Sequence, residues 1–172
     1  MKKIILLGYM GSGKSTIAQL LSEKLSVKCL DLDAVVEEIE QMSISEIFEM
    51  KGEIYFRKKE HFVFKELLQT KDNLIISLGG GTPCYAGNHE LLNGDNIQSF
   101  YLKSSLEVLL SRLKNKSHKR PIIQGKTEEE LREFIAPHLF ERSYFYQQAT
   151  HIIDTDGLSK EQVVQKIISV LR

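Results

Sequence analysis

Short apolar runs alternate with stretches of helical periodicity along the whole chain. Residues 4–7 are uniformly apolar, whereas residues 14–25 place apolar side chains at helical spacing. We expect five strands, within residues 4–7, 27–32, 73–83, 97–102 and 151–155. We expect helices at residues 14–25, 33–42, 43–52, 54–70, 106–113, 127–148 and 159–171. This alternation predicts an α/β fold in which a parallel sheet carries helices on both faces.

Local signals define several of the helix ends. Ser43 with Glu46 has the pattern of a capping box, and Thr127 opens a similar "TEEE" string before another long helix. Gly52 marks the expected end of a helix. Residues 114–126 are polar, basic and contain a proline, which predicts a mobile excursion between two helices.

Composition narrows the class of protein. The chain of 172 residues is 42% hydrophobic and 27% charged, which fits one soluble domain spanning residues 1–172. Basic and acidic residues both number 23, so the balance does not support broad nucleic-acid binding. Two cysteines, Cys29 and Cys84, predict reduced thiols, and the apolar start is too short to span a membrane. We expect a cytoplasmic protein with no membrane partner.

The turn between the first strand and the first helix carries "GYMGSGKS" at residues 8–15, which fits the P-loop pattern. Its glycines let successive backbone N–H groups face phosphate oxygens, and the helix start adds a positive end. We expect Lys14 to reach the β- and γ-phosphates and the Ser15 hydroxyl to ligate Mg²⁺. A glycine-rich turn without a ligand would not require a lysine followed by a hydroxyl. The sequence therefore predicts a nucleoside triphosphate site.

Two carboxylates follow the second strand. Asp31 and Asp33 should lie at the carboxyl end of the sheet, where open α/β folds bind ligands. One could complete the metal shell while the other accepts a proton from a substrate hydroxyl. The alternative for Asp33 is that it caps the following helix, and the two roles are compatible.

The third strand ends in "SLGGG" without the aspartate that P-loop proteins often carry there. Ser77 stands where a residue of the metal shell could be, which makes Asp31 more necessary to the metal. Gly79, Gly80 and Gly81 allow a ligand to approach the backbone closely, although a permissive loop is the simpler alternative.

GTP-binding switches normally carry an NKxD-type motif that recognises the guanine base, and this sequence has no good match to it. The nearest strings, at Asn115 and Thr70, do not fit. A small-molecule kinase fits better than a switch.

At this point the chain resembles the shikimate kinase family over nearly its whole length. The matching strings, in order, are "GYMGSGKST", "DLD", "SISEIFEMKGEIYFRKKE", "ISLGGGTP", "KRPI" and "ERSYFYQQA". The resemblance implies a three-layer α/β/α P-loop kinase fold with a parallel sheet in the order 2-3-1-4-5. It implies transfer of the γ-phosphate of ATP to the 3-hydroxyl of shikimate, with one Mg²⁺ ion as cofactor.

The resemblance also assigns the acceptor residues, in a helical region at about 33–62 and beyond. Asp33 would bind the substrate hydroxyls and act as the base. Arg57 and Arg142 would hold the carboxylate, for which an arginine fork is well shaped. Glu60 lies three residues after Arg57 on the same helix face and can hold that guanidinium in place. Further acceptor contacts are implied for Phe48, Phe56, Glu60, Gly79, Gly80 and Gly81. From the residues alone, Arg57 could instead lie on a solvated helix face, and the two phenylalanines could be plain core residues.

On the ATP side, the resemblance implies contacts from the P-loop at 8–16 and from a lid at about 112–126. The residues concerned are Gly11, Ser12, Gly13, Lys14, Ser15, Thr16, Arg112 and Arg120. Arg120 would neutralise charge on the transferring phosphate, Arg112 would stack on adenine, and the loop from Asp154 would lie on the adenine side.

Three positions depart from the family pattern. Met42 replaces a glycine, and Tyr144 and Phe145 replace a proline and a leucine near Arg142. We expect at most a slight shift of the carboxylate site.

Two other functions compete with this interpretation. One is a gluconate kinase-like or other small-metabolite kinase, and the other is a non-catalytic nucleotide-binding regulator. A regulator would need neither the base Asp33 nor the cation Arg120. We expect a monomer with ATP and shikimate as its small-molecule partners.

Overall fold

The computed structural model describes residues 2–114 and 123–171. Five parallel strands form one sheet in the order β2-β3-β1-β4-β5. The strands are β1 (Lys3–Leu7), β2 (Lys28–Asp31), β3 (Leu74–Ser77), β4 (Ile97–Lys103) and β5 (His151–Asp154). The predicted α/β class and strand order are confirmed.

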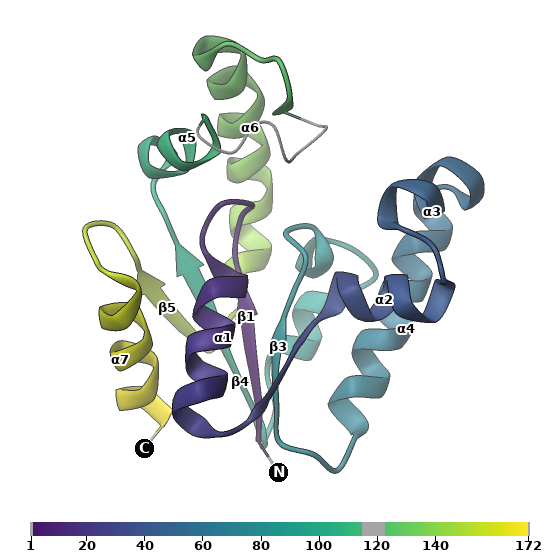
Figure 1. Cartoon of the computed structure of the whole chain (residues 1–172), viewed down its shortest axis with the longest axis vertical. Helices are drawn as coiled ribbons and strands as arrows, with labels where there is room; N and C mark the ends of the chain where they lie inside the picture. Colours follow the sequence, from purple (N-terminus) through teal and green to yellow (C-terminus); the bar gives the residue numbers. More distant parts are fainter. Residues whose placement is uncertain (1, 115–122, 172) are drawn as a thin grey trace.

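Helices cover both faces of this sheet (Figure 1). They are α1 (Lys14–Leu25), α2 (Leu32–Glu40), α3 (Ile44–Lys51), α4 (Glu53–Gln69), α5 (Leu106–Lys114), α6 (Glu128–Tyr146) and α7 (Lys160–Leu171). Two short 3₁₀ helices, η1 (Thr82–Cys84) and η2 (Asn88–Leu92), follow β3.

Alternation along the central strand divides the apolar interior into two cores. Ile4 and Leu6 of β1 pack with α1 and α7, whereas Ile5 and Leu7 pack with the helices of the other face. All five residues of β1 are buried, as expected for a central parallel strand. The carboxyl edge of this doubly covered sheet leads into the P-loop after β1, into α2 after β2 and into the glycine-containing loop after β3.

The predicted capping boxes are both present. The Ser43 hydroxyl accepts from Glu46 N at 3.2 Å, and the Glu46 carboxylate accepts from Ser43 N at 2.7 Å. Thr127 and Glu130 make the same reciprocal pair at the start of α6. Gly52 ends α3 and also precedes α4 directly, with φ 85°.

At the carboxyl edge, one alternative that the sequence left open is excluded, and one predicted strand is shorter than expected. Asp33 does not cap α2: the cap is Asp31, whose Oδ1 accepts from the backbone N of Asp33 and Ala34. The chain turns into the helix at Leu32, earlier than expected, because this carboxylate satisfies the first free N–H groups. The third strand also stops at Ser77, so the three glycines lie in the loop leading to η1.

Candidate active site

The P-loop joins β1 to α1 with its phosphate-facing backbone in the expected place. Gly13 precedes the helix in a left-handed conformation, with φ 94°, which favours glycine. The Lys14 ammonium folds back over the loop and donates to the backbone oxygens of Gly8 at 2.8 Å and Tyr9 at 3.0 Å. The loop and the lysine therefore form a compact cationic cradle at the start of α1.

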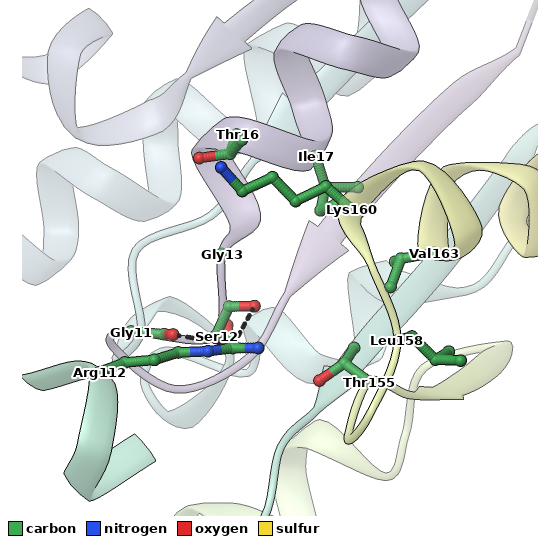
Figure 2. Close-up of a pocket in the computed structure, with 10 residues that line it drawn as sticks. All are labelled: Gly11, Ser12, Gly13, Thr16, Ile17, Arg112, Thr155, Leu158, Lys160 and Val163. Atoms are coloured by element: carbon green, nitrogen blue, oxygen red, sulfur yellow. Dashed lines mark hydrogen bonds between the residues drawn. The ribbon is translucent and has the colours of Figure 1, made fainter. Parts of the chain in front are cut away.

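A cavity of about 270 Å³ lies beside this cradle (Figure 2). It is lined by Gly11, Ser12, Gly13, Thr16, Ile17, Arg112, Thr155, Leu158, Lys160 and Val163. The Arg112 guanidinium lies across the loop, with Nη1 donating to Gly11 O at 3.2 Å and Ser12 O at 3.4 Å. Predicted ATP residues from the P-loop and Arg112 thus share one cavity, whose far wall comes from the loop after β5 and from α7.

A second, smaller cavity of about 240 Å³ lies at the ends of β2 and β3 and includes Ser15, Asp31 and Ser77. The Ser15 hydroxyl is 3.5 Å from Asp31 Oδ2, the oxygen that faces away from the helix cap. The Ser77 hydroxyl is buried and has no hydrogen-bond partner among the residues that the structure describes. Two hydroxyls and a carboxylate are hard oxygen donors of the kind that Mg²⁺ prefers. These residues fit the predicted metal.

Residues 2–114 and 123–171 contain no cluster of three or more His, Cys, Asp or Glu side chains that could hold a metal ion. The same part of the chain has no helix with the length and apolar character needed to cross a membrane.

Asp33 lies in the first turn of α2, half-buried. Its pKa is raised to about 6, first by burial and then by the nearby carboxylates of Glu60 and Asp31. Lys14 and Arg57 act in the opposite direction. A carboxylate in such a balance is ionised at neutral pH but accepts a proton readily.

The glycine triplet brings three charged side chains together. A methyl group on Gly79 would lie 2.9 Å from Asp33 Oδ1, and one on Gly81 would lie 2.7 Å from Arg57 Nη2. A methyl group on Gly80, the middle glycine, would lie 3.4 Å from Arg142 Nη1. An added methyl group at Gly79 or Gly81 would crowd Asp33 or Arg57, so these positions favour glycine, and contact of the triplet with a ligand stays a prediction.

Arg57 is not a solvated charge on an outer helix face. Its Nη1 donates to Glu60 Oε2 at 3.0 Å, and its Nε lies 3.5 Å from Glu53 Oε1. The Glu60 side chain is only 1% exposed. The Tyr85 ring faces the guanidinium, 4.1 Å from its central carbon. The predicted pairing of Arg57 with Glu60 is present.

Two tyrosines belong to the same region, and the residue patterns did not single them out. Tyr9 of the P-loop is buried and its hydroxyl is 2.8 Å from His138 Nδ1. The Tyr146 hydroxyl donates to Gly80 O at 2.6 Å, and burial raises its pKa well above the usual range. Both lie near Arg142. In the sequence they stand only as members of the strings "GYMGSGKST" and "ERSYFYQQA", which were selected for other residues.

The predicted aromatic residues lie mainly in the core. Phe56 is 3% exposed and packs against Phe48, with ring centroids 4.9 Å apart. The Arg57 guanidinium lies 5.0 Å from the Phe56 ring centroid. Phe56 therefore supports the arginine, and its direct contact with a substrate stays a prediction.

The three departures from the family pattern lie in two places. Met42 packs against the larger core. Tyr144 and Phe145 pack near His89, with ring centroids 6.4 Å and 5.2 Å away, and Tyr144 is 63% exposed. Arg120, with most of the predicted lid, lies outside the described residues.

Comparisons with known proteins point to one family. The family model described as shikimate kinase matches residues 10–172. A curated shikimate kinase of Flavobacterium johnsoniae is 54% identical over 171 residues, which is 99% of each chain.

Two solved structures are similar as well. The crystal structure of a shikimate kinase from Bacteroides thetaiotaomicron has a TM-score of 0.91 and 37% identity, and the match covers 99% of this chain and 98% of that one. A shikimate kinase from Acinetobacter baumannii, solved in complex with shikimate, has a TM-score of 0.83 and 32% identity, with 99% and 93% covered. The P-loop, the paired carboxylates and the charged side chains around the glycine triplet thus occur in a chain that belongs to the shikimate kinase family.

Proposed function

We propose that this protein transfers the γ-phosphate of ATP to the 3-hydroxyl of shikimate, releasing shikimate 3-phosphate and ADP. The observation that carries the proposal is the convergence of Asp33, Arg57 and Arg142 on the glycine triplet, beside the P-loop. This arrangement offers one acid–base group and two guanidinium groups to a small hydroxylated carboxylic acid. Membership in the family supports the same assignment.

On the donor side, the backbone N–H groups of the P-loop and the Lys14 ammonium hold the phosphates. In the present geometry Lys14 donates to backbone oxygens within its own loop, so it is already oriented over the cradle. Arg112 and Thr16 line the adjoining cavity and contribute to nucleotide binding. From the lid, Arg120 neutralises charge on the transferring phosphate.

Ser15 and Asp31 would hold the magnesium ion that accompanies ATP, with the buried hydroxyl of Ser77 at the same cavity. When bound, the ion would offset negative charge on the phosphate oxygens. Asp31 can take this role while capping α2, because each function uses a different carboxylate oxygen.

On the acceptor side, Arg57 and Arg142 hold the carboxylate and Asp33 receives the hydroxyl proton. The bond between the γ-phosphorus and the β–γ bridging oxygen breaks while a bond to the 3-oxygen of shikimate forms. ADP leaves with the electron pair, and the proton passes to Asp33. Most of the rate enhancement comes from positioning and charge neutralisation, as in other phosphoryl transfers.

We further propose that the protein acts as a monomer in the cytoplasm. Every site residue named above comes from one chain, and Cys29 and Cys84 are free thiols, as a reducing compartment requires. Light scattering on the purified protein tests the first point; a stable dimer would contradict it.

The function is tested by ADP release from Mg·ATP with shikimate, gluconate or a nucleoside monophosphate as acceptor. Of the three acceptors, we expect only shikimate to stimulate ADP release strongly, with formation of a phosphate monoester visible by ³¹P NMR. Stimulation by gluconate alone would favour the related metabolite kinase. No stimulation by any acceptor, with ATP still bound, would favour a nucleotide-binding regulator.

A further inference from the structure

The orientation of Arg57 depends on a buried carboxylate with two different donors. Glu60 Oε2 accepts from Arg57 Nη1 at 3.0 Å, while Glu60 Oε1 accepts from the Thr82 hydroxyl at 2.6 Å. Glu60 is 1% exposed and Thr82 is fully buried. Because water does not solvate this carboxylate freely, its rotation is set by these two hydrogen bonds.

Thr82 is itself held from several sides. Its backbone N donates to Gly79 O at 3.1 Å, so the residue closes the turn of the glycine triplet. Its backbone oxygen accepts from Asn88 Nδ2 at 2.9 Å. The Thr82 hydroxyl therefore has a fixed position relative to the loop that faces Asp33 and Arg57.

Asn88 connects the same loop back to α4. Since its Nδ2 donates to Thr82 O, its Oδ1 is the atom 2.7 Å from His61 Nδ1 and must accept from it. His61 directly follows Glu60 in α4. The loop after β3 thus contacts α4 at two successive residues, one of which orients Arg57.

We propose that Thr82 is a positioning residue for recognition of the acceptor carboxylate, acting on Arg57 through Glu60. The inference rests on the proposed function, because it concerns how Arg57 is presented to shikimate. A bidentate contact between Arg57 and the shikimate carboxylate requires the two planar groups to be aligned. Because Glu60 orients Arg57, a small rotation of Glu60 would misalign the guanidinium and weaken that contact. Thr82 need not touch the substrate to have this effect.

The test is steady-state kinetics of Thr82→Val, which keeps the shape of the side chain and removes its hydroxyl. We expect the KM for shikimate to rise about 10-fold, because Glu60 loses the hydrogen bond that fixes its orientation and no longer aligns Arg57. The kcat and the KM for ATP should stay within about 2-fold of the unchanged protein. Thr82→Ser restores the hydroxyl and should return the KM for shikimate to near its original value. Ser22→Ala removes a hydroxyl that donates to Val27 O at 2.7 Å, at the C-terminal end of α1 and outside the Thr82–Asn88–His61 contacts, and should leave both KM values unchanged.

A double-mutant cycle with Glu60→Gln distinguishes action through Glu60 from a general loosening. If Thr82 acts through this carboxylate, Thr82→Val should add little to the KM for shikimate in the Glu60→Gln background. The double variant also removes the unpaired charge, so it remains measurable if Thr82→Val alone folds poorly. Additive effects, or equal increases of both KM values, would overturn the proposal.

The two proposals fail in different ways. If the unchanged protein phosphorylates shikimate but Thr82→Val keeps a normal KM for it, only the role of Thr82 is wrong. If the unchanged protein does not phosphorylate shikimate at all, both the function and the positioning role are wrong.

Discussion

Asp33 illustrates how several opposing interactions set the chemistry of one residue. Burial and the carboxylates of Glu60 and Asp31 disfavour its charge, while the cations Lys14 and Arg57 favour it. The resulting pKa of about 6 leaves the side chain ionised at neutral pH and still basic enough to take a proton. Keeping this partly desolvated charge in the folded state lowers the free energy of unfolding.

We predict that Asp33→Asn lowers activity and raises stability at the same time. The kcat should fall by about 10²–10⁴ if Asp33 is the base. Because the folded-state pKa is raised, ionised Asp33 destabilises the protein above about pH 6, and this penalty fades as the pH falls toward 4. The variant should therefore be more stable than the unchanged protein by about 1–3 kcal/mol at pH 8, with little difference near pH 4.

Urea unfolding at both pH values measures the stability difference, and an ADP-release assay measures kcat. A variant that loses stability equally at pH 8 and pH 4 would show that Asp33 is not held at a raised pKa. A near-normal kcat would show that Asp33 only positions the substrate.

At Arg57 the prediction concerns shape rather than charge. Arg57→Lys keeps the cation but loses the fork that contacts Glu60 and faces Tyr85. We expect the KM for shikimate to rise by about 10-fold or more, as one or two hydrogen bonds to a charged group are lost. Kinetics with each substrate varied in turn measure the effect. A change confined to the KM for ATP would contradict the carboxylate role.

At the scale of elements, the segment between β3 and β4 supplies several parts of the candidate acceptor site. Within a few residues it contains the glycine triplet, η1 and the turn Tyr85–Asn88, which is closed by Asn88 N donating to Tyr85 O at 3.0 Å. Ala86 and Gly87 at its centre have φ 51° and 70°, as a type I′ turn requires. Ala86 is the poor fit, because a left-handed alanine costs about 1 kcal/mol.

We predict that Ala86→Asn stabilises the protein. Ala86 is exposed, and asparagine tolerates a positive φ without the added chain entropy of glycine. The expected gain is about 0.5–1 kcal/mol, or roughly 1–4 °C in Tm for a protein of this size. Thermal unfolding measures it. The same substitution at Ala136, inside α6, should lower Tm, and a lower Tm for Ala86→Asn would mean that the turn is not under this constraint.

The two capping boxes were predicted more accurately than the end of β3 and the cap of α2. The boxes at Ser43 and Thr127 were predicted correctly because a capping box is a local exchange of hydrogen bonds over four residues. The end of β3 was placed too late, and Asp33 was considered as a cap of α2 where Asp31 is the cap, because the local sequence fixes neither the last paired residue nor the capping carboxylate. Pairing of β3 with its neighbours, and the direction of the Asp31 side chain, decided both.

At the scale of the whole molecule, the sheet brings distant segments to one edge. The P-loop follows β1, Asp31 ends β2, Asp33 lies in the first turn of α2, and the glycine triplet follows β3. Helices α4 and α6 supply Arg57 and Arg142 to the same edge (Figure 1). The site therefore depends on how closely a loop can pass a helix from another part of the chain.

We predict that Gly81→Ala impairs shikimate binding with little loss of stability. The added methyl group would lie 2.7 Å from Arg57 Nη2, the far end of a flexible side chain that can move away. The fold should persist with a Tm change of a few degrees at most, while the KM for shikimate rises about 10-fold and the KM for ATP stays nearly constant. Gly94→Ala, whose added methyl would meet only the Ile97 side chain, is the matched control. Unchanged shikimate kinetics would mean that Arg57 does not need its present position.

The sequence by itself determined the α/β alternation, the P-loop and both capping boxes, and through a family resemblance it predicted the residues of the acceptor site. These are regular patterns or short strings whose physical meaning is local. Only the tertiary structure decided that Arg57 is held by Glu60 rather than solvated, that Phe56 lies in the core, and that Thr82 and Tyr85 complete the surroundings of Arg57. It also decided the raised pKa of Asp33. Burial and charge–charge distances arise between segments far apart in the chain, so no local pattern carries them.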